Sequence, residues 1–435
     1  MNILIIGQCS LHWGRMEFGN IGNYYILEPF VRELHATFPG CELRTTMQLS
    51  QRFCEGEKVT SLPMELYYAW DPNELSAAQE ELAISEEYKK HGKLACRTPY
   101  IDAVMWADLV IDFSGDIWGD NANFLGPDRF RVGLIKDQIA INLGKRVAML
   151  AGSPGPFSNA DTRELAREVY AGFDLVTNRE PISMQLLQDA GFDTTRTVTL
   201  ACPAFLFEAA PPAEISNIIR REEYELGGGG RPLVGFIVCG WNFTTGPFDR
   251  WPRTNDEYST FCEAVEFLTG SLNARVCLMS HSNGFDPSSP AFMLQHGRDY
   301  PIAKQLQQVL ESRGIARNVF AIDGVYDAWK TKAIIGSFDM LVSGRVHAAV
   351  AGLSQRVPTV IVDYGHEPKA HKLRGFAAVA GAQDYVANPA SATDLIEKIE
   401  ACWSERSAIR NHLDLHIQAV NDLAKRNFRL LKELF

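Results

Sequence analysis

The stretch Asn2-Ile-Leu-Ile-Ile-Gly7 decides the fold of this 435-residue chain. Its apolar, mostly β-branched residues run without interruption to a glycine, which is typical of a strand buried on both faces of a parallel sheet. A loop rich in glycine and aromatic residues follows, and a helical pattern then runs from Tyr24 to Thr37. Strand, loop and helix in this order predict the opening of a doubly wound α/β sheet.

Strand and helix patterns continue to alternate along the first half of the chain, and this alternation favours a parallel sheet with helices on both faces. Strands are expected at Leu109–Asp112, Arg146–Leu150, Leu175–Thr177 and near Val198. Helices are expected at Asn73–Lys93, Phe130–Leu143, Asp161–Gly172 and Ile182–Ala190.

A second alternation of the same kind follows, which predicts a second parallel sheet. Strands are expected at Leu233–Val238, Arg275–Ser280, Val319–Ile322, Met340–Ser343 and Thr359–Asp363. Helices are expected at Asp256–Ser271, Ile302–Arg313 and Ala328–Gly336, and two amphipathic helices from Ser391 onward.

The two alternating regions are separated by the strongest linker signal in the sequence, where Ala209–Ala213 and the glycine run Gly227–Gly230 bracket a charged helix. We therefore predict one domain at residues 1–208, a linker at 209–231 and a second domain at 232–390. The helices of residues 391–435 are expected to cross back to the first domain. The predicted fold class is two facing doubly wound, Rossmann-like domains, the GT-B type of architecture.

The composition is that of a globular protein, with 46% hydrophobic and 22% charged residues. The formal charge of −11 leaves no basic field to hold nucleic acid, so an anionic ligand must be held by a few local cations. The nine cysteines are scattered and lack CxxC spacing, which fits reduced thiols in a cytoplasm. Because we find neither a signal peptide pattern nor a run of about 18 apolar residues, we expect a cytoplasmic protein without a transmembrane segment.

Residues that can hold an anion and exchange a proton follow one strand of the predicted second domain. In open parallel sheets, ligands bind at the carboxyl ends of strands, where helix N-termini present free N–H groups to anions. Ser343-Gly-Arg-Val-His347 joins the strand Met340–Ser343 to a helix of small residues, Ala348–Leu353. Arg345 supplies a fixed positive charge there, and His347 can exchange a proton near neutral pH, with a purely structural histidine as the alternative.

The next strand ends in another basic segment, Asp363-Tyr-Gly-His-Glu-Pro-Lys-Ala-His-Lys372. Lys372 is the candidate anion ligand of this segment. A solvated loop is the alternative interpretation, and it is favoured for the other three basic residues, His366, Lys369 and His371. His281 is a further strand-end candidate, and the lack of an HExxH or paired-cysteine motif predicts that the protein holds no metal.

Three loops of the first half carry candidate residues. Gly19-Asn-Ile-Gly22-Asn23 opens a helix, as either a phosphate-cradling or cleft-lining loop or a tight turn, and it lacks the GxGxxG pattern of dinucleotide binding. Asp116 can accept a proton or hold a sugar hydroxyl, or it caps the next helix. Arg179 offers planar bidentate donors to a carboxylate or phosphate, or it is a surface residue paired with Glu180.

Taken in order along most of the chain, these motifs resemble those of the polysaccharide pyruvyl transferase family. In the first half, the matching segments are Asn20–Asn23 (family Asn-x-Gly-Asp), Ala107–Asp116 with Asp120, Gly152–Phe157, Arg179–Ser183 (Arg-Glu-x-x-Ser) and Cys202–Phe205 (Asp-Pro-Ala-Phe). In the second half, they are Ser343–Ala348 (Ser-x-Arg-Leu-His-Ala), Tyr364 and His371-Lys372.

The resemblance implies a transferase that attaches pyruvate from phosphoenolpyruvate to a saccharide as a ketal, with no cofactor besides this substrate. Under this hypothesis Arg179, Arg345 and Lys372 bind the anionic donor, and His347 is the general acid or base. Asp116 is then a base or an acceptor ligand. The first domain is expected to bind the acceptor and the second the donor, and the candidate acceptor or cleft residues are Asn20, Gly22, Asn23, Asp120, His281 and Tyr364.

The sequence departs from the family pattern at three positions. Asn23 and Cys202 replace aspartates, which bears on acceptor binding and activity and keeps other functions open, whereas Val346 for leucine is conservative. A GT-B glycosyltransferase that uses a nucleotide sugar is one alternative. A binding protein that has lost catalysis is another. A third is a relative that acts on a small secondary metabolite, for which the aromatic insert Trp241–Arg253 would shape a pocket.

Overall fold

The computed structural model describes residues 1–12, 14–221, 230–248, 250–286, 293–315, 317–365 and 370–435. The chain divides into two compact units, and both are discontinuous in sequence. The first unit comprises Met1–Met16, Glu28–Pro203 and Asp422–Phe435, and the second comprises Glu17–Leu27 and Ala204–Asn421. Our domain boundaries from the sequence stay a prediction, and Gly227–Gly229 of the expected linker lie outside the described residues.

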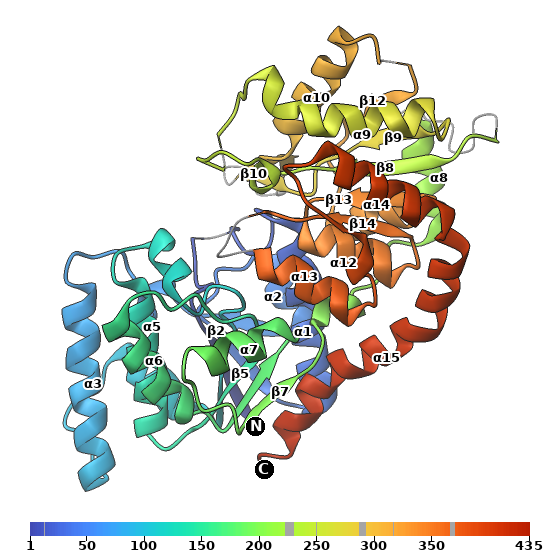
Figure 1. Ribbon diagram of the computed structural model, residues 1–435. Coiled ribbons are helices and arrows are strands. Elements are labelled where there is room, and N and C mark those ends of the chain that lie inside the picture. The colour runs from blue at the N-terminus through green and yellow to red at the C-terminus, as the bar shows by residue number, and fades with distance from the viewer. Residues whose placement is uncertain (13, 222–229, 249, 287–292, 316, 366–369) are drawn as a thin grey trace. The chain divides into compact units, whose positions relative to one another are not determined.

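The first unit contains a seven-stranded parallel sheet in the order β3-β2-β1-β4-β5-β6-β7. Figure 1 labels its strands β2, β5 and β7. Its strands are β1 (Asn2–Ile6), β2 (Glu42–Thr45), β3 (Val59–Ser61), β4 (Leu109–Asp112), β5 (Arg146–Gly152), β6 (Leu175–Asn178) and β7 (Thr197–Thr199). The central strand β4 is buried along its whole length, as its apolar residues Leu109–Ile111 predict, and its last residue, Asp112, is buried as well.

Helices connect these strands as parallel crossovers require. They are α1 (Ile21–Thr37), α2 (Gln51–Glu57), α3 (Glu74–His91), α4 (Pro99–Trp106), α5 (Arg129–Asn142), α6 (Ala160–Ala171) and α7 (Ile182–Asp189). The ends of α3 match the helix dipole, with Glu74 in its first turn, Lys89, Lys90 and His91 in its last, and the left-handed Gly92 closing it.

The core of the first unit is built around Trp118, which is completely buried. Four phenylalanine rings surround it with centroid distances of 5.5 to 6.3 Å, those of Phe130, Phe157, Phe173 and Phe192. Its indole N–H donates to Oδ2 of Asp137 at 3.3 Å. The aromatic core therefore holds a carboxyl group at its edge.

The second unit contains a six-stranded parallel sheet in the order β12-β9-β8-β13-β14-β15. Its strands are β8 (Leu233–Ile237), β9 (Arg275–Leu278), β12 (Val319–Ala321), β13 (Met340–Ser343), β14 (Thr359–Val362) and β15 (Val386–Ala387). A separate antiparallel hairpin follows β9 and consists of β10 (Asn283–Asp286) and β11 (Met293–His296).

Helices α8 (Pro212–Arg221), α9 (Ser259–Gly270), α10 (Tyr300–Ser312), α11 (Ala328–Gly336), α12 (Val346–Ser354), α13 (Ala370–Val379), α14 (Ala392–Ser404) and α15 (Arg406–Lys432) complete the chain. Side chains cap two of them, since Asp327 accepts from the backbone N–H of Lys330 and Ser391 from that of Asp394. None of the helices in the described ranges is both long and apolar enough to cross a membrane.

The prediction of two doubly wound, Rossmann-like domains is confirmed. The six strands of the second sheet follow the same order as the first six of the first sheet, to which β7 is added. The direction of winding reverses between β1 and β4 in the first unit and between β8 and β13 in the second. Ligands bind at such switch points, outside the carboxyl ends of the strands. The sequence did not predict the elements β2, β3, β10, β11, β15, α2, α4 and α13.

Candidate active site

The switch point of the second unit is closed by a hydrogen-bond network around Asn242. Its Oδ1 accepts from the backbone N–H of Cys239 at 2.9 Å, and its Nδ2 donates to the carbonyl of Val362 at 3.1 Å. The chain after β13 approaches so closely that a Cβ on Gly344 would collide with the Asn242 amide. Asn242 thereby links the ends of β8, β13 and β14 and fixes the backbone that carries Arg345.

Arg345 is buried and forms a bidentate pair with the fully buried Asp299. Its Nε donates to Oδ2 of Asp299 at 2.9 Å, and its Nη2 donates to Oδ1. Burial alone would lower the pKa of Arg345, but the charge of Asp299 outweighs this effect and raises it. Arg345 is therefore cationic as predicted, but part of its charge is balanced within the protein.

His281 lies near this pair and is completely buried. Burial, together with the positive charge of Arg345, lowers its pKa to about 3. Neither ring nitrogen has a hydrogen-bond partner among the described residues. The imidazole is neutral at physiological pH, and it can still donate or accept a hydrogen bond.

His347 occupies the first turn of α12, two residues after Arg345. Arg345 is the N-cap residue of α12 and its side chain makes no capping hydrogen bond, so the free N–H groups of the helix start favour an anion. The imidazole contacts the ring of Phe376 edge to face at 5.7 Å. The imidazole thus lies at a helix terminus whose dipole favours an anion.

Asn20, Gly22 and Asn23 lie in the second unit, although we expected them on the acceptor side of the first domain. Oδ1 of Asn20 accepts from the backbone N–H of Gly22 at 3.1 Å at the start of α1. A Cβ built on Gly22 would lie 2.6 Å from both Cβ and Nδ1 of His347. The structure therefore brings the Asn20–Asn23 turn together with His347.

Tyr364 and Lys372 are also in the second unit, and both side chains are buried. The Tyr364 ring lies 6.1 Å from that of Trp241, which stacks on Phe248 at 4.6 Å. His371 is buried as well, which does not fit a solvated loop. The candidates His366 and Lys369 lie outside the described residues.

The aromatic insert Trp241–Arg253 is organised by its last residue. The guanidinium of Arg253 donates to the carbonyls of Thr245, Pro247 and Phe248, each at 3.2 Å. It also lies 4.0 Å from the centroid of the Phe243 ring. The buried arginine supports the insert from inside.

The switch point of the first unit is built from Asp112 and Ser114. Oδ1 of Asp112 accepts from the backbone N–H of Ser114 at 2.7 Å, and the Ser114 hydroxyl donates to Oδ2 at 2.9 Å. Ser114 Oγ in turn accepts from the N–H of Gln8 at 2.9 Å. This turn joins the end of β4 to the end of β1 and aims the following loop, which carries Asp116.

Arg179 and Asp116 meet at the same edge of this sheet. Nη2 of Arg179 lies 3.3 Å from Oδ1 of Asp116, and its Nε donates to Ser153 Oγ at 2.9 Å. Glu180 instead accepts from the backbone N–H groups of Ile182 and Ser183 at the start of α7. The alternative of a surface arginine paired with Glu180 is therefore wrong, since Arg179 is buried and bonded elsewhere.

Two more polar residues lie along this edge. Oδ2 of Asp120 accepts from the N–H and the hydroxyl of Ser158, both at 2.5 Å. Asn178 ends β6, and its fully buried amide has no hydrogen-bond partner among the described residues. Asp120 is thus a structural link to the Gly152–Phe157 loop, while Asn178 has bonding capacity that the described chain does not use.

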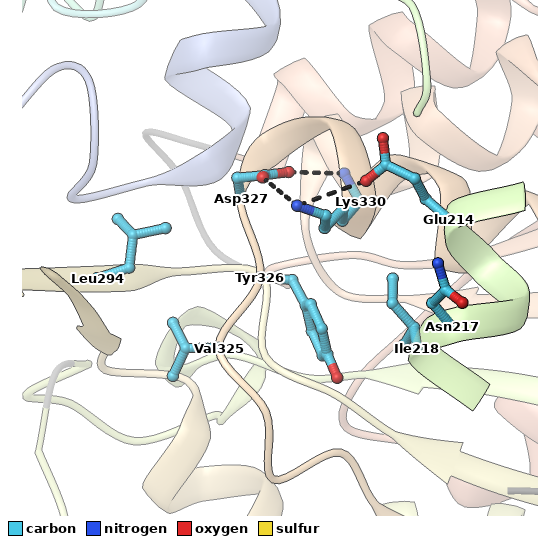
Figure 2. A pocket seen from close by; sticks show the side chains of 8 residues that line it. All are labelled: Glu214, Asn217, Ile218, Leu294, Val325, Tyr326, Asp327 and Lys330. Atoms are coloured by element: carbon cyan, nitrogen blue, oxygen red, sulfur yellow. Dashed lines mark hydrogen bonds and ion pairs between the residues drawn. The ribbon is translucent and has the colours of Figure 1, made fainter. Parts of the chain in front are cut away.

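A pocket of about 300 Å³ opens beside the loop after β12 in the second unit (Figure 2). Figure 2 shows Lys330 between Asp327 and Glu214, with Nζ to carboxylate distances of 3.0 and 3.5 Å. Two carboxylates and one ammonium leave the pocket with a net negative charge. It therefore disfavours a phosphorylated ligand and is not the predicted donor site.

Sequence reasoning missed Asp299 and Asn242, which fix the candidate site. Asp299 is the N-cap residue of α10 and lies far along the chain from Arg345, so no local spacing reveals the pair. The described ranges hold no group of three His, Cys, Asp or Glu side chains arranged as a metal site. That the protein needs no metal stays a prediction, as do the catalytic roles of the named residues.

The two Rossmann-like domains resemble those of solved sugar-nucleotide proteins of GT-B type. Anabaena HepE in complex with UDP is 14% identical, with a TM-score of 0.58 covering 100% of this chain and 99% of that chain. UDP-GlcNAc 2-epimerase from Methanocaldococcus jannaschii is 12% identical, with a TM-score of 0.57 covering 100% of both chains. At this level of identity the likeness defines the fold class alone.

Sequence comparison identifies the family. The profile of polysaccharide pyruvyl transferase matches residues 20–366, and the chain belongs to this family of transferases. The amylovoran biosynthesis protein AmsJ of Erwinia amylovora is 21% identical over 383 residues, which cover 84% of each chain. The family resemblance seen in the ordered motifs is confirmed.

Proposed function

We propose that this protein transfers the pyruvyl group of phosphoenolpyruvate to hydroxyl groups of a saccharide and forms a pyruvate ketal. Membership in the polysaccharide pyruvyl transferase family supports this reaction class. The observation that carries the proposal is the position of His347 in the first turn of α12, two residues after Arg345 at the switch point. Such a place suits a group that moves a proton beside a bound anion.

The reaction adds one proton to the donor, removes one proton from each of two hydroxyl groups, and releases one leaving group. A proton adds to the methylene carbon of phosphoenolpyruvate, which makes C2 electrophilic, and a saccharide hydroxyl then attacks C2. A second hydroxyl attacks C2 as phosphate leaves with the electrons of the C–O bond. One hydroxyl proton replaces the proton given to the methyl group, and the other leaves with phosphate.

We assign the proton transfer to the methylene carbon to His347. Arg345 and Lys372 supply positive charge in the second unit for the phosphate and carboxylate of the donor. Arg179 adds a guanidinium in the first unit, where Asp116 and Ser153 orient it. Asp116 is the candidate base for the attacking hydroxyl because its carboxylate is the more exposed partner of that pair.

The acceptor is proposed to be a saccharide because the family description names a polysaccharide. The biosynthetic role in the name of AmsJ supports a similar role here. We also propose that the reaction needs no cofactor besides phosphoenolpyruvate and that it takes place in the cytoplasm, where phosphoenolpyruvate is available. The scattered free cysteines fit a reducing compartment.

The test is an assay of the purified full chain with phosphoenolpyruvate and a panel of saccharides. We expect phosphate release that depends on the saccharide, together with an acceptor whose mass increases by one pyruvate ketal. A parallel thermal-shift series with phosphoenolpyruvate, UDP-sugars and free phosphate tests the donor. Stabilisation by a UDP-sugar with no response to phosphoenolpyruvate would instead support a glycosyltransferase.

A further inference from the structure

The segment Glu17–Leu27 is close in sequence to the first strand of the chain, yet it belongs to the second compact unit. Its centre is the turn Asn20–Asn23, in which the side chain and the carbonyl of Asn20 accept from the N–H groups of Gly22 and Asn23. Helix α1 starts in this turn. The turn is therefore held in a fixed conformation by its own asparagine.

The first turns of α1 lie on side chains from the carboxyl edge of the second sheet. Gly22 faces His347 of α12, and the ring of Tyr25 contacts that of His281 after β9 at 5.3 Å. The rings of Tyr24 and Trp329 are 4.8 Å apart. These contacts come from separate elements of the second unit and seat the segment over its switch point.

We propose that the Asn20–Asn23 turn is part of the donor-side catalytic centre and that Gly22 is the positioning residue for His347. This inference rests on the proposed function, and it replaces our expectation that the turn serves the acceptor. Gly22 is not among the glycines with positive φ, so the backbone conformation does not require a glycine. The close approach of the imidazole does require a glycine, because real Cβ atoms are essentially never closer than 3.0 Å to a neighbouring atom.

A second observation concerns polar side-chain atoms at the same carboxyl edge of the second sheet. The ring nitrogens of His281 and the hydroxyl of Tyr25 are fully buried and have no hydrogen-bond partner among the described residues. Buried polar atoms are normally satisfied by protein, water or a ligand. The segment thus covers polar groups that a donor oxygen or a bound water would satisfy, within range of the charge of Arg345.

The test compares Gly22→Ala with Gly270→Ala in α9, where an added Cβ meets nothing within 4 Å. A displaced imidazole costs proton transfer but not acceptor binding, so we expect kcat of Gly22→Ala to fall by about 10-fold to 100-fold. We also expect a shifted pH profile of kcat and an unchanged KM for the saccharide. Gly270→Ala should keep wild-type kinetics, and thermal unfolding would verify that both variants are folded.

The outcomes separate this inference from the proposed function. If the wild-type protein releases no phosphate from phosphoenolpyruvate with any saccharide, the proposed function fails. If the wild type is active and Gly22→Ala keeps its kcat and pH profile, or raises only the saccharide KM, the positioning role is wrong.

Should Gly22→Ala fail to fold, Asn20→Ala decides, because it releases the Gly22 N–H without adding atoms near His347. A fall in kcat supports the inference, and unchanged kcat overturns it.

Discussion

Asp299 accepts two hydrogen bonds from the guanidinium of Arg345, and both side chains are buried in the second unit. A buried cation needs such a partner, because the loss of one member leaves the other charge uncompensated. The pair also holds the guanidinium in a single orientation at the start of α12. Asp299 is thus the residue on which the geometry of the predicted donor site depends.

We predict that Asp299→Ala destabilises the protein by about 3 to 5 kcal/mol, because Arg345 would remain buried and unpaired. Urea unfolding measures this change. The matched control is Asp414→Asn, which removes an exposed pair with Arg356 and should change stability by less than about 1 kcal/mol. Equal effects of the two substitutions would show that the buried pair has no special role.

His347→Ala should abolish turnover and leave binding of phosphoenolpyruvate largely intact, since the imidazole moves a proton in our proposal. Arg345→Ala should weaken donor binding as well, because it removes a fixed charge from the site. Isothermal titration with phosphoenolpyruvate, combined with the phosphate-release assay, separates the two effects. Near-normal turnover of His347→Ala would make the assignment of proton transfer wrong.

Arg179→Lys should raise the KM for phosphoenolpyruvate by about 10-fold or more and leave the fold intact. A lysine ammonium cannot reproduce the planar fork that contacts Asp116 and Ser153 together. The control is Arg146→Lys, at an exposed pair with Asp174 in the same unit. Steady-state kinetics would refute the donor role if Arg179→Lys bound phosphoenolpyruvate as the wild type does.

The pair of buried carboxyls in the first unit predicts a pH dependence of stability. Burial raises the pKa of Asp112 to about 6, and burial together with the charge of Asp112 raises that of Asp137. The folded state therefore binds more protons than the unfolded state, whose carboxyls titrate near pH 4, and stability falls as the pH rises through this range.

Asp137→Asn should reduce this loss, because an amide can donate a hydrogen bond to Asp112 without titrating. Between pH 4 and pH 8 we expect the variant to gain stability relative to the wild type. Urea unfolding at both pH values measures the difference. Asp102→Asn, at an exposed pair with Arg97, serves as the control, and a variant that follows the wild-type pH dependence would contradict the assignment.

The sequence predicted the central strands well because their residues are buried on both faces. The expected ranges Leu109–Asp112 and Met340–Ser343 coincide with β4 and β13. By contrast, β2 alternates more exposed and buried residues over only four positions, and such a pattern is weak in any window. Strand β3 is shorter still and is at the edge of its sheet.

The sequence predicted only those residues of the candidate site that directly follow the end of a strand. Arg345 and His347 follow directly from the end of β13, so position alone identified them. The partners that orient these residues come from distant parts of the chain. Asp299 is one example, and Gly22 is another, because its segment is close in sequence to the first strand but belongs to the second unit. Pairings of this kind depend on tertiary structure, which periodicity and spacing do not encode.

His281 gives the last prediction, because its folded pKa of about 3 lies far below the value near 6.5 of an unfolded histidine. The unfolded state binds the extra proton, so stability should be full above pH 6.5 and fall as the pH drops from there towards 3. His281→Phe removes this titration, and urea unfolding at pH 7 and pH 5 should show a smaller loss of stability than in the wild type.

In the enzyme assay, His281→Gln should lower kcat without moving its apparent pKa between pH 5 and 8, since the neutral imidazole does not titrate there. A shift of that apparent pKa as large as the one caused by substituting His347 would assign the proton transfer to His281 instead.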